Sequence, residues 1–122
     1  MPILERLDLS CNKIIDLSSL SNIKTLECLK YLDLSNNLID WLFGLEAVSK
    51  SLEHLNLAEN KLVKMENLEC LKSLKILNLR NNLISTIENL GSIPLEELDL
   101  TNNRISKIGQ NINIPALKKL NV

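Results

Sequence analysis

The chain has 122 residues, enough for one domain, and acidic and basic residues nearly cancel to a formal charge of −1. That balance gives no field to attract nucleic-acid phosphates, and the apolar stretches are too short to cross a bilayer. Only 2% of the residues are aromatic, while branched aliphatics fill the apolar positions. We therefore expect a protein that binds neither nucleic acid nor membrane.

A block of the form L-x-x-L-x-L-x-x-N-x-[LI] recurs along the whole chain. Complete copies begin at Leu4, Leu29, Leu52, Leu74 and Leu95, and a partial sixth copy begins at Leu117. The intervals are 25, 23, 22, 21 and 22 residues. Each copy alternates apolar and polar residues first, which predicts a strand, and then places an apolar residue at every third position, which suits 3₁₀ turns. One strand and one short return cannot bury an apolar face alone, so the copies must stack.

The first two repeats depart from the pattern in their return segments. Repeat 1 carries one further step of three, through Ile23 and Leu26, which predicts an extra 3₁₀ turn or a bulge on the convex side. Repeat 2 holds every aromatic residue of the chain: Tyr31, Trp41 and Phe43. Because Trp41 and Phe43 flank the inward residue Leu42, we expect both rings to point outward.

Repeats 3 and 4 are regular, but repeat 5 drifts. Ile105 and Ile108 fit the inward pattern, whereas Asn111 stands where the earlier repeats have a leucine. We expect Ile112 and Ile114 to refill that layer after a local shift.

Neither end of the array carries a recognisable capping unit. Apolar strand residues begin at Leu4 and continue to Leu120 and Val122. A stack of repeats needs terminal units with a polar outer face. We therefore expect residues 1–122 to form one repeat domain that is a fragment of a longer polypeptide, or whose ends are covered by a partner or by self-association.

Two columns of equivalent positions, counted from the first Leu of each repeat, have a structural interpretation. Position 2 alternates in sign, so each charge has opposite neighbours in a parallel, in-register sheet; its residues are Glu5, Lys30, Glu53, Lys75, Glu96 and Lys118. Position 9 is always asparagine, whose amide can bridge the turns of adjacent layers through two donors and an acceptor; these residues are Asn12, Asn37, Asn60, Asn82 and Asn103.

Three other columns should point to the open, concave face, because strand side chains alternate. Position 3 is heterogeneous, with Arg6, Tyr31, His54, Ile76, Glu97 and Lys119. A layered fold does not require that diversity, so the column is either a partner surface or a solvated face free to vary.

Position 5 is always Asp or Asn, which are poor strand residues. The column either forms a hydrogen-bonded ladder, which we favour, or offers an acidic stripe at Asp8 and Asp33 to a basic partner. Arg80 is the only charge in position 7, a column of small residues, and is a candidate anchor.

Trp41 and Phe43 are further binding candidates, because neighbouring exposed aromatics are frequent interaction hot spots. The alternative is that they cover the longer return of repeat 1. Against an enzyme, the chain has a single histidine, His54, on a flat sheet, which is poor material for acid–base catalysis.

Other motifs that would indicate a cofactor or a metal are missing. There is no G-x-G phosphate loop, and the odd number of cysteines with no C-x-x-C indicates neither a zinc site nor a disulfide framework. We expect no cofactor and no metal. With no signal-peptide pattern and no N-x-[ST] sequon, we expect a cytoplasmic protein, with the nucleus and the cilium as other compartments.

The blocks LERLDLSCNKI, LKYLDLSNNLI, LEHLNLAENKL, LKILNLRNNLI and LEELDLTNNRI resemble leucine-rich repeats. With the 22-residue period and an I-x-x-I-x-x-L return, they look like the subclass named for the regulatory leucine-rich subunit of protein phosphatase-1. The stretch from Gly44 to Leu55 is similar to a repeat of the axonemal outer-arm dynein light chain. The resemblance implies an α/β right-handed solenoid, with a parallel sheet on the concave side and 3₁₀ or irregular returns on the convex side.

The same resemblance implies a non-enzymatic scaffold that binds another protein through its concave face. We expect a regulatory or adaptor protein whose partner is a phosphatase catalytic subunit. The alternative is a structural or motor-associated component of the cilium or centrosome, whose partner is a cytoskeletal motor.

Overall fold

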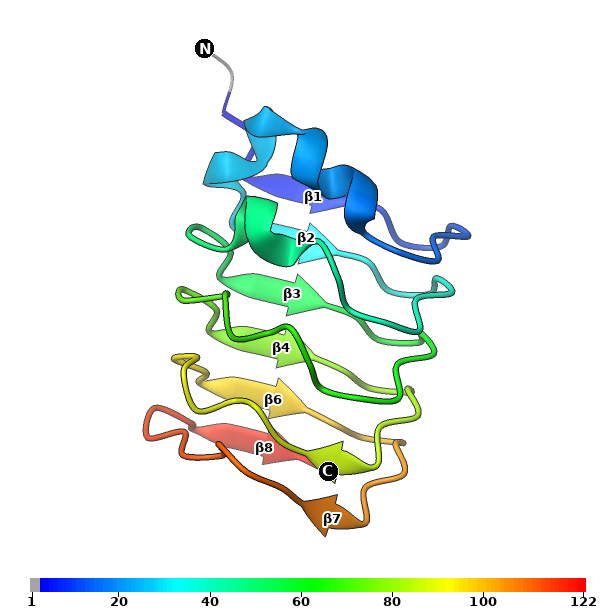
Figure 1. The fold of residues 1–122 in the computed structure, drawn as a ribbon, viewed down its shortest axis with the longest axis vertical. Coiled ribbons are helices and arrows are strands. Elements are labelled where there is room, and N and C mark those ends of the chain that lie inside the picture. Colours follow the sequence, from blue (N-terminus) through cyan, green and yellow to red (C-terminus); the bar gives the residue numbers. More distant parts are fainter. Residues whose placement is uncertain (1–2) are drawn as a thin grey trace.

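The strands of successive repeats lie side by side in one parallel sheet, as the computed structural model of residues 3–122 shows (Figure 1). In order across the sheet, the strands are β1 (Arg6–Asp8), β2 (Tyr31–Asp33), β3 (His54–Asn56), β4 (Ile76–Asn78), β6 (Glu97–Asp99) and β8 (Lys119–Asn121). The central leucine of each strand pairs with the central leucine of the next, beginning with Leu7 and Leu32. The predicted leucine-rich-repeat solenoid is confirmed.

The return segments all cross the same face of the sheet, so that the opposite face stays open (Figure 1). Repeat 1 returns through two 3₁₀ helices, η1 (Ser18–Asn22) and η2 (Lys24–Cys28), and repeat 2 through one, η3 (Leu45–Val48). The extra 3₁₀ turn predicted for repeat 1 is confirmed. None of the helices within residues 3–122 has the length and apolar character needed to cross a membrane.

The returns of repeats 4 and 5 contain short strands, and our expectation of 3₁₀ turns there is wrong. The strands β5 (Thr86–Ile87) and β7 (Lys107–Ile108) form a second, two-stranded parallel sheet. Thr86 and Ile87 are β-branched, which favours extended backbone. A neighbouring extended return offers pairing partners, and the Gly109 N–H donates to the Ile87 carbonyl at 2.8 Å. Pairing between layers therefore overrides the period of three.

The core lies between the sheet and the returns. It consists of aliphatic side chains stacked by position, with Leu32, Leu55 and Leu77 from the strands facing residues such as Leu42 and Met65 from the returns. Each fully buried aliphatic side chain contributes about 1.5–3 kcal/mol relative to an exposed one. The strand side chains on either side of these leucines consequently point to the open face, which is where positions 3 and 5 lie.

In repeat 5, the left-handed residue of the return lies one position later than in repeats 3 and 4. Asn67 and Asn89 have positive φ angles of 61° and 62° at position 16, whereas repeat 5 reaches the same conformation one residue later, at Asn111 with φ 57°. The prediction that Ile108 points inward is confirmed, since it pairs in register with the core-packed Ile87 and lines an apolar hollow with Leu98 and Leu117. It is 65% exposed because it lies in the outermost complete layer of the described array. Of the two residues expected to refill the layer, Ile114 packs against the core but Ile112 remains exposed.

The asparagines of position 9 connect each layer to the one before it. In Asn60, the side-chain oxygen Oδ1 accepts from the Ile39 N–H at 3.0 Å. Its Nδ2 donates to the Leu34 carbonyl at 2.9 Å and to Leu57 of its own turn at 3.1 Å. Asn37, Asn82 and Asn103 make equivalent bonds. Asn12, in the first layer, is exposed and bonds only to its own turn.

A second asparagine column lies on the return side, and sequence reasoning missed it. Nδ2 of Asn67 donates to the Leu42 carbonyl, and Nδ2 of Asn89 donates to the Met65 carbonyl at 2.9 Å, so each bond reaches the preceding layer. Both residues adopt the left-handed conformation, which asparagine tolerates better than most residues. The sequence did carry a signal for this column. Position 16 is Gly44, Asn67 and Asn89 in repeats 2 to 4, and glycine and asparagine are the residue types that most readily adopt positive φ.

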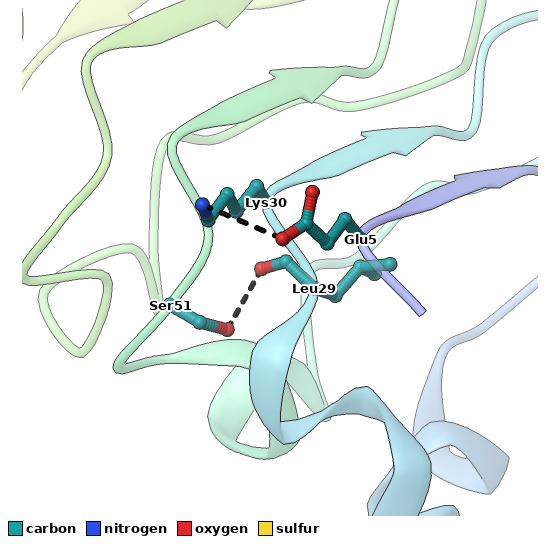
Figure 2. Close-up of polar contacts among 4 residues, drawn as sticks. All are labelled: Glu5, Leu29, Lys30 and Ser51. Atoms are coloured by element: carbon teal, nitrogen blue, oxygen red, sulfur yellow. Dashed lines mark hydrogen bonds and ion pairs between the residues drawn. The ribbon is translucent and has the colours of Figure 1, made fainter. Parts of the chain in front are cut away.

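The alternating charges of position 2 form ion pairs at two of their junctions. Figure 2 shows the first, in which Nζ of Lys30 lies 3.6 Å from Oε1 of Glu5. In the same view, the Ser51 hydroxyl donates to the Leu29 carbonyl at 2.7 Å. Lys118 and Glu96 form the second pair at 3.0 Å. These exposed pairs contribute little individually, but they favour the observed register.

Candidate functional site

The heterogeneous residues of position 3 lie in one row across the open face. Strand pairing aligns Arg6 with Tyr31, Tyr31 with His54, and His54 with Ile76. The row continues through Glu97 to Lys119. Because each strand contributes one residue at the same register, side chains far apart in the sequence become neighbours about 4.8 Å apart.

The first three side chains of this row contact one another. The Arg6 guanidinium lies over the Tyr31 ring, 4.0 Å from its centroid, in a cation–π arrangement. The His54 ring meets the Tyr31 ring edge-on, with 4.6 Å between centroids and 68° between planes. Tyr31, His54 and Ile76 are half-buried, so the centre of the open face is a largely apolar surface that is already packed before any partner arrives.

The environment of His54 favours its neutral form. Partial burial lowers the pKa of His54 below its ordinary value, and the nearby charge of Arg6 lowers it further. Asp33 and Glu97 oppose this effect from either side. The imidazole is therefore neutral near pH 7, and it can donate or accept a hydrogen bond on the face.

The Asp and Asn residues of position 5 form local turns, so the ladder that we favoured for this column is wrong. Oδ1 of Asp33 accepts from the Ser35 N–H at 2.9 Å, and Oδ1 of Asn56 accepts from the Ala58 N–H at 3.1 Å. Asp8, Asn78 and Asp99 likewise bind the N–H two residues on. Such Asx turns are a local preference of these two residue types. They explain a uniform column of poor strand residues by turns within each layer, and one hydrogen bond between layers is added where the Asn121 side chain reaches Asp99.

Two carboxylates of this column are held ionised. The Ser10 hydroxyl and N–H hold the pKa of Asp8 below its ordinary value. Burial opposes ionisation of Asp99, but bonds from the Thr101 hydroxyl and N–H, with the charge of Arg80, keep its pKa low as well. The open face thus carries fixed negative charge at both of its ends.

A shallow hollow lies on the C-terminal half of the open face. It has a volume of about 230 Å³ and is lined by His54, Ile76, Asn78, Glu97, Asp99 and Lys119, among others. One wall is apolar, at Ile76, and another is acidic, at Glu97 and Asp99. The hollow has the chemistry to receive a side chain from a partner. It lies along the row of position 3 residues, with His54 in its lining and Tyr31 beside His54.

The remaining candidates lie elsewhere. Arg80 is exposed, two residues beyond β4, close enough to influence Asp99. Trp41 and Phe43 lie on the return side, where they are 53% and 45% exposed and stack with 5.3 Å between centroids. The structure therefore brings Arg6, Asp8, Tyr31, Asp33, His54, Ile76 and Glu97 together on one face and separates them from the aromatic pair.

The site shows no arrangement for metal chemistry within the described part of the chain. No group of three or more His, Cys, Asp or Glu side chains in residues 3–122 could hold a metal ion. Asn56 and Asn78, at the middle of position 5, also lie on this face, but they were not among the binding candidates named from the sequence. Their signal was the change from Asp to Asn at the middle of position 5.

Comparison with known protein families agrees with this architecture. A model described as Leucine Rich Repeat matches residues 4–26, 28–46 and 94–120. A second, described as Leucine Rich repeats (2 copies), matches residues 50–92. No curated protein sequence matches the chain.

Proposed function

The chain belongs to the leucine-rich repeat family, and we propose that it is a non-enzymatic scaffold that holds a partner protein on the open face of its sheet. Leucine-rich repeat domains generally mediate protein–protein interaction, and solenoids present extended concave surfaces for that purpose. The observation that carries the proposal is the row Arg6–Tyr31–His54–Ile76, whose members are aligned, half-buried or exposed, and not needed by the core.

For the finer role, we propose a regulatory or adaptor subunit that binds a phosphatase catalytic subunit. Its support is the 22-residue period and the I-x-x-I-x-x-L return. The alternative is a component of the cilium or centrosome that binds a cytoskeletal motor, supported by the stretch from Gly44 to Leu55 and by a second exposed surface at Trp41 and Phe43. We propose the cytoplasm as its compartment, since all three cysteines are free.

The experiment compares an open-face variant with a return-side variant. Ile76→Glu places a charge at the centre of the face, and Val63→Glu places the same charge at an exposed return-side position. Purified phosphatase-1 catalytic subunit and a dynein motor domain serve as candidate partners in a binding assay. We expect Ile76→Glu to abolish binding and Val63→Glu to leave it unchanged. Equal binding by both variants would refute the use of the open face.

A further inference from the structure

We propose that a second copy of this chain docks head to tail, so that β1 of one copy extends the sheet beyond β8 of the other. This interface lies at the two ends of the described array and is separate from the open face that is proposed to hold a partner protein. Three features of the end surfaces favour the same arrangement: their apolar side chains, their backbone groups and their charges.

The surface beyond β8 is apolar. A hollow of about 180 Å³ lies there, lined only by aliphatic side chains that include Ile108, Leu117 and Leu120. Inside the array, the leucines of the equivalent positions are fully buried by the next layer. At the opposite end of the array, Leu4 is exposed and Leu7 is half-buried. In a continued sheet, Leu4 and Leu7 of a second copy lie next to Leu117 and Leu120, and apolar surface of both copies is removed from water.

Each internal junction of the sheet uses the same backbone groups. Between β1 and β2, the Lys30 and Tyr31 N–H groups both donate to the Glu5 carbonyl, at 2.8 and 2.9 Å. In the other direction, the Leu9 N–H donates to the Asp33 carbonyl at 2.8 Å. In terms of repeat positions, the N–H groups of positions 2 and 3 meet the carbonyl of position 2, and the N–H of position 6 meets the carbonyl of position 5.

The same positions lie free at the two ends of the described chain, because no described strand lies beside the outer edge of β1 or of β8. The edge of β1 presents the Glu5 and Arg6 N–H groups and the Asp8 carbonyl. The edge of β8 presents the Lys118 carbonyl and the Val122 N–H. Docking one edge against the other therefore forms the bonds found at every internal junction, with donors and acceptors in matching places.

Asn12 supplies a further bond across this junction. Nδ2 of Asn37 donates to the Leu9 carbonyl, at position 6 of the layer before it, at 3.0 Å. Nδ2 of Asn12 bonds only to carbonyls of its own turn. In the docked pair, the Val122 carbonyl of the first copy takes the place of the position 6 carbonyl. Asn12 of the second copy then continues the asparagine column across the interface.

Charge selects the head-to-tail arrangement. Position 2 alternates in sign along the six strands, so the column begins with Glu5 and ends with Lys118. Head-to-tail docking places these opposite charges side by side, as in the two ion pairs of this column. A tail-to-tail dimer brings Lys118 and Lys119 of both copies to one interface. In the head-to-tail pair, Lys119 does lie next to Arg6, but the Arg6 guanidinium is directed toward β2, over the Tyr31 ring.

Sedimentation velocity of the 122-residue protein over a wide range of concentrations gives the first test. A head-to-tail contact leaves a free head and a free tail after each addition, so copies add until a ring closes or a filament forms. We therefore expect species larger than a dimer whose share rises with concentration. A protein that stays monomeric throughout would overturn the proposal, and so would an assembly that stops at a dimer.

A matched pair of variants tests the backbone contact. Val122→Pro removes the N–H that meets Asp8 of the next copy, whereas Val122→Ala keeps it. This N–H makes no backbone hydrogen bond within residues 3–122, so neither change should lower the melting temperature. We expect Val122→Pro to weaken assembly about tenfold relative to Val122→Ala, the effect of one hydrogen bond. Equal assembly of the two variants would contradict strand pairing at the junction.

Charge exchange tests the direction of docking. Glu5→Lys and Lys118→Glu each place like charges at the junction, and each should weaken assembly about fivefold. The double variant restores opposite signs between copies, so its assembly should recover. It also lacks both ion pairs within the chain, so recovery cannot come from restored stability of the monomer. A double variant that assembles no better than the single ones would overturn the head-to-tail arrangement.

The two proposals fail on different measurements. Ile76→Glu lies in the fourth strand of six, away from both ends, and should leave assembly unchanged. Val122→Pro lies at the end of the array and should leave partner binding on the open face unchanged. Loss of assembly in Ile76→Glu would show that copies meet through the open face, and would overturn docking through the ends.

Discussion

Asn60 and Leu34 lie 26 positions apart in the sequence, yet Nδ2 of Asn60 donates a hydrogen bond to the Leu34 carbonyl at 2.9 Å. The other side of the same amide accepts from the Ile39 N–H. One side chain thus satisfies backbone groups of two successive layers, in an interior from which water is excluded.

Replacing this amide should be costly in the middle of the array and cheap at its beginning. Asn60→Leu leaves buried donors and acceptors without partners, at about 1–3 kcal/mol for each group. Asn12→Leu removes bonds within one exposed turn only, so we expect a loss of about 1 kcal/mol or less. Urea denaturation of both variants measures the difference. Equal losses would contradict the bridging role of the buried amide.

Glu59 should be replaceable with a gain in stability. It adopts φ 57° at position 8, where repeats 2, 4 and 5 have Asn36, Asn81 and Asn102 at nearly the same angle. A residue with a long side chain pays a steric penalty in this conformation that asparagine largely avoids. We expect Glu59→Asn to raise the free energy of unfolding by about 0.5–1 kcal/mol. The reverse change, Asn81→Glu, should lower it by a similar amount.

Gly44 cannot accept a side chain. Its φ is +93°, and a Cβ there would lie 2.5 Å from the Leu17 carbonyl oxygen. Gly44→Ala should therefore destabilise by at least about 2 kcal/mol, from conformational strain and the displaced backbone of repeat 1. Gly91→Ala is the matched control, because Gly91 lacks a positive φ and its nearest contact would be 3.2 Å. Thermal melting distinguishes the two, and similar melting temperatures would refute the argument.

His54 should make stability depend on pH in the weakly acidic range. Burial, helped by Arg6, lowers the pKa of His54 from its ordinary 6.5. The unfolded chain then binds a proton more readily than the folded one, so stability is complete above pH 6.5 and falls as the pH drops toward the folded pKa. His54→Gln should remove this dependence between pH 6.5 and 5. A variant with an unchanged pH profile would show that other groups cause it.

Trp41 and Phe43 should contribute little to folding, because both rings are largely exposed. Trp41→Ala with Phe43→Ala should cost about 1 kcal/mol or less, near the value of one exposed aromatic pair. If the pair is a binding hot spot, the double variant should remain folded by circular dichroism and lose affinity for its partner. Retained affinity would end that interpretation, and a cooperative loss of the 3₁₀ helices of repeat 1 would favour a covering role.

The strands and their register could be predicted from the sequence because Leu and Asn recur at fixed positions that only stacking explains. Leu7, Leu32 and Leu55 align as their spacing requires. The short strand in the return of repeat 4 could not be predicted from the sequence. Thr86 and Ile87 form a strand only because Lys107 and Ile108 lie beside them. The hydrogen bonds of Asp33 and Asn56 could not be predicted from the sequence either. A ladder between layers and a turn within one layer favour the same residue types, and only the positions of the N–H groups separate them.

The sign alternation that joins Glu5 to Lys30 and Glu96 to Lys118 bears on how such an array can lengthen during evolution. Duplicating a single repeat (one coil of the solenoid) would place two like charges beside each other. Glu53, for example, would lie next to a second copy of itself. Duplicating a pair of coils would restore the alternation at every new junction. Growth by even numbers of coils is therefore the path that keeps every junction of this column attractive.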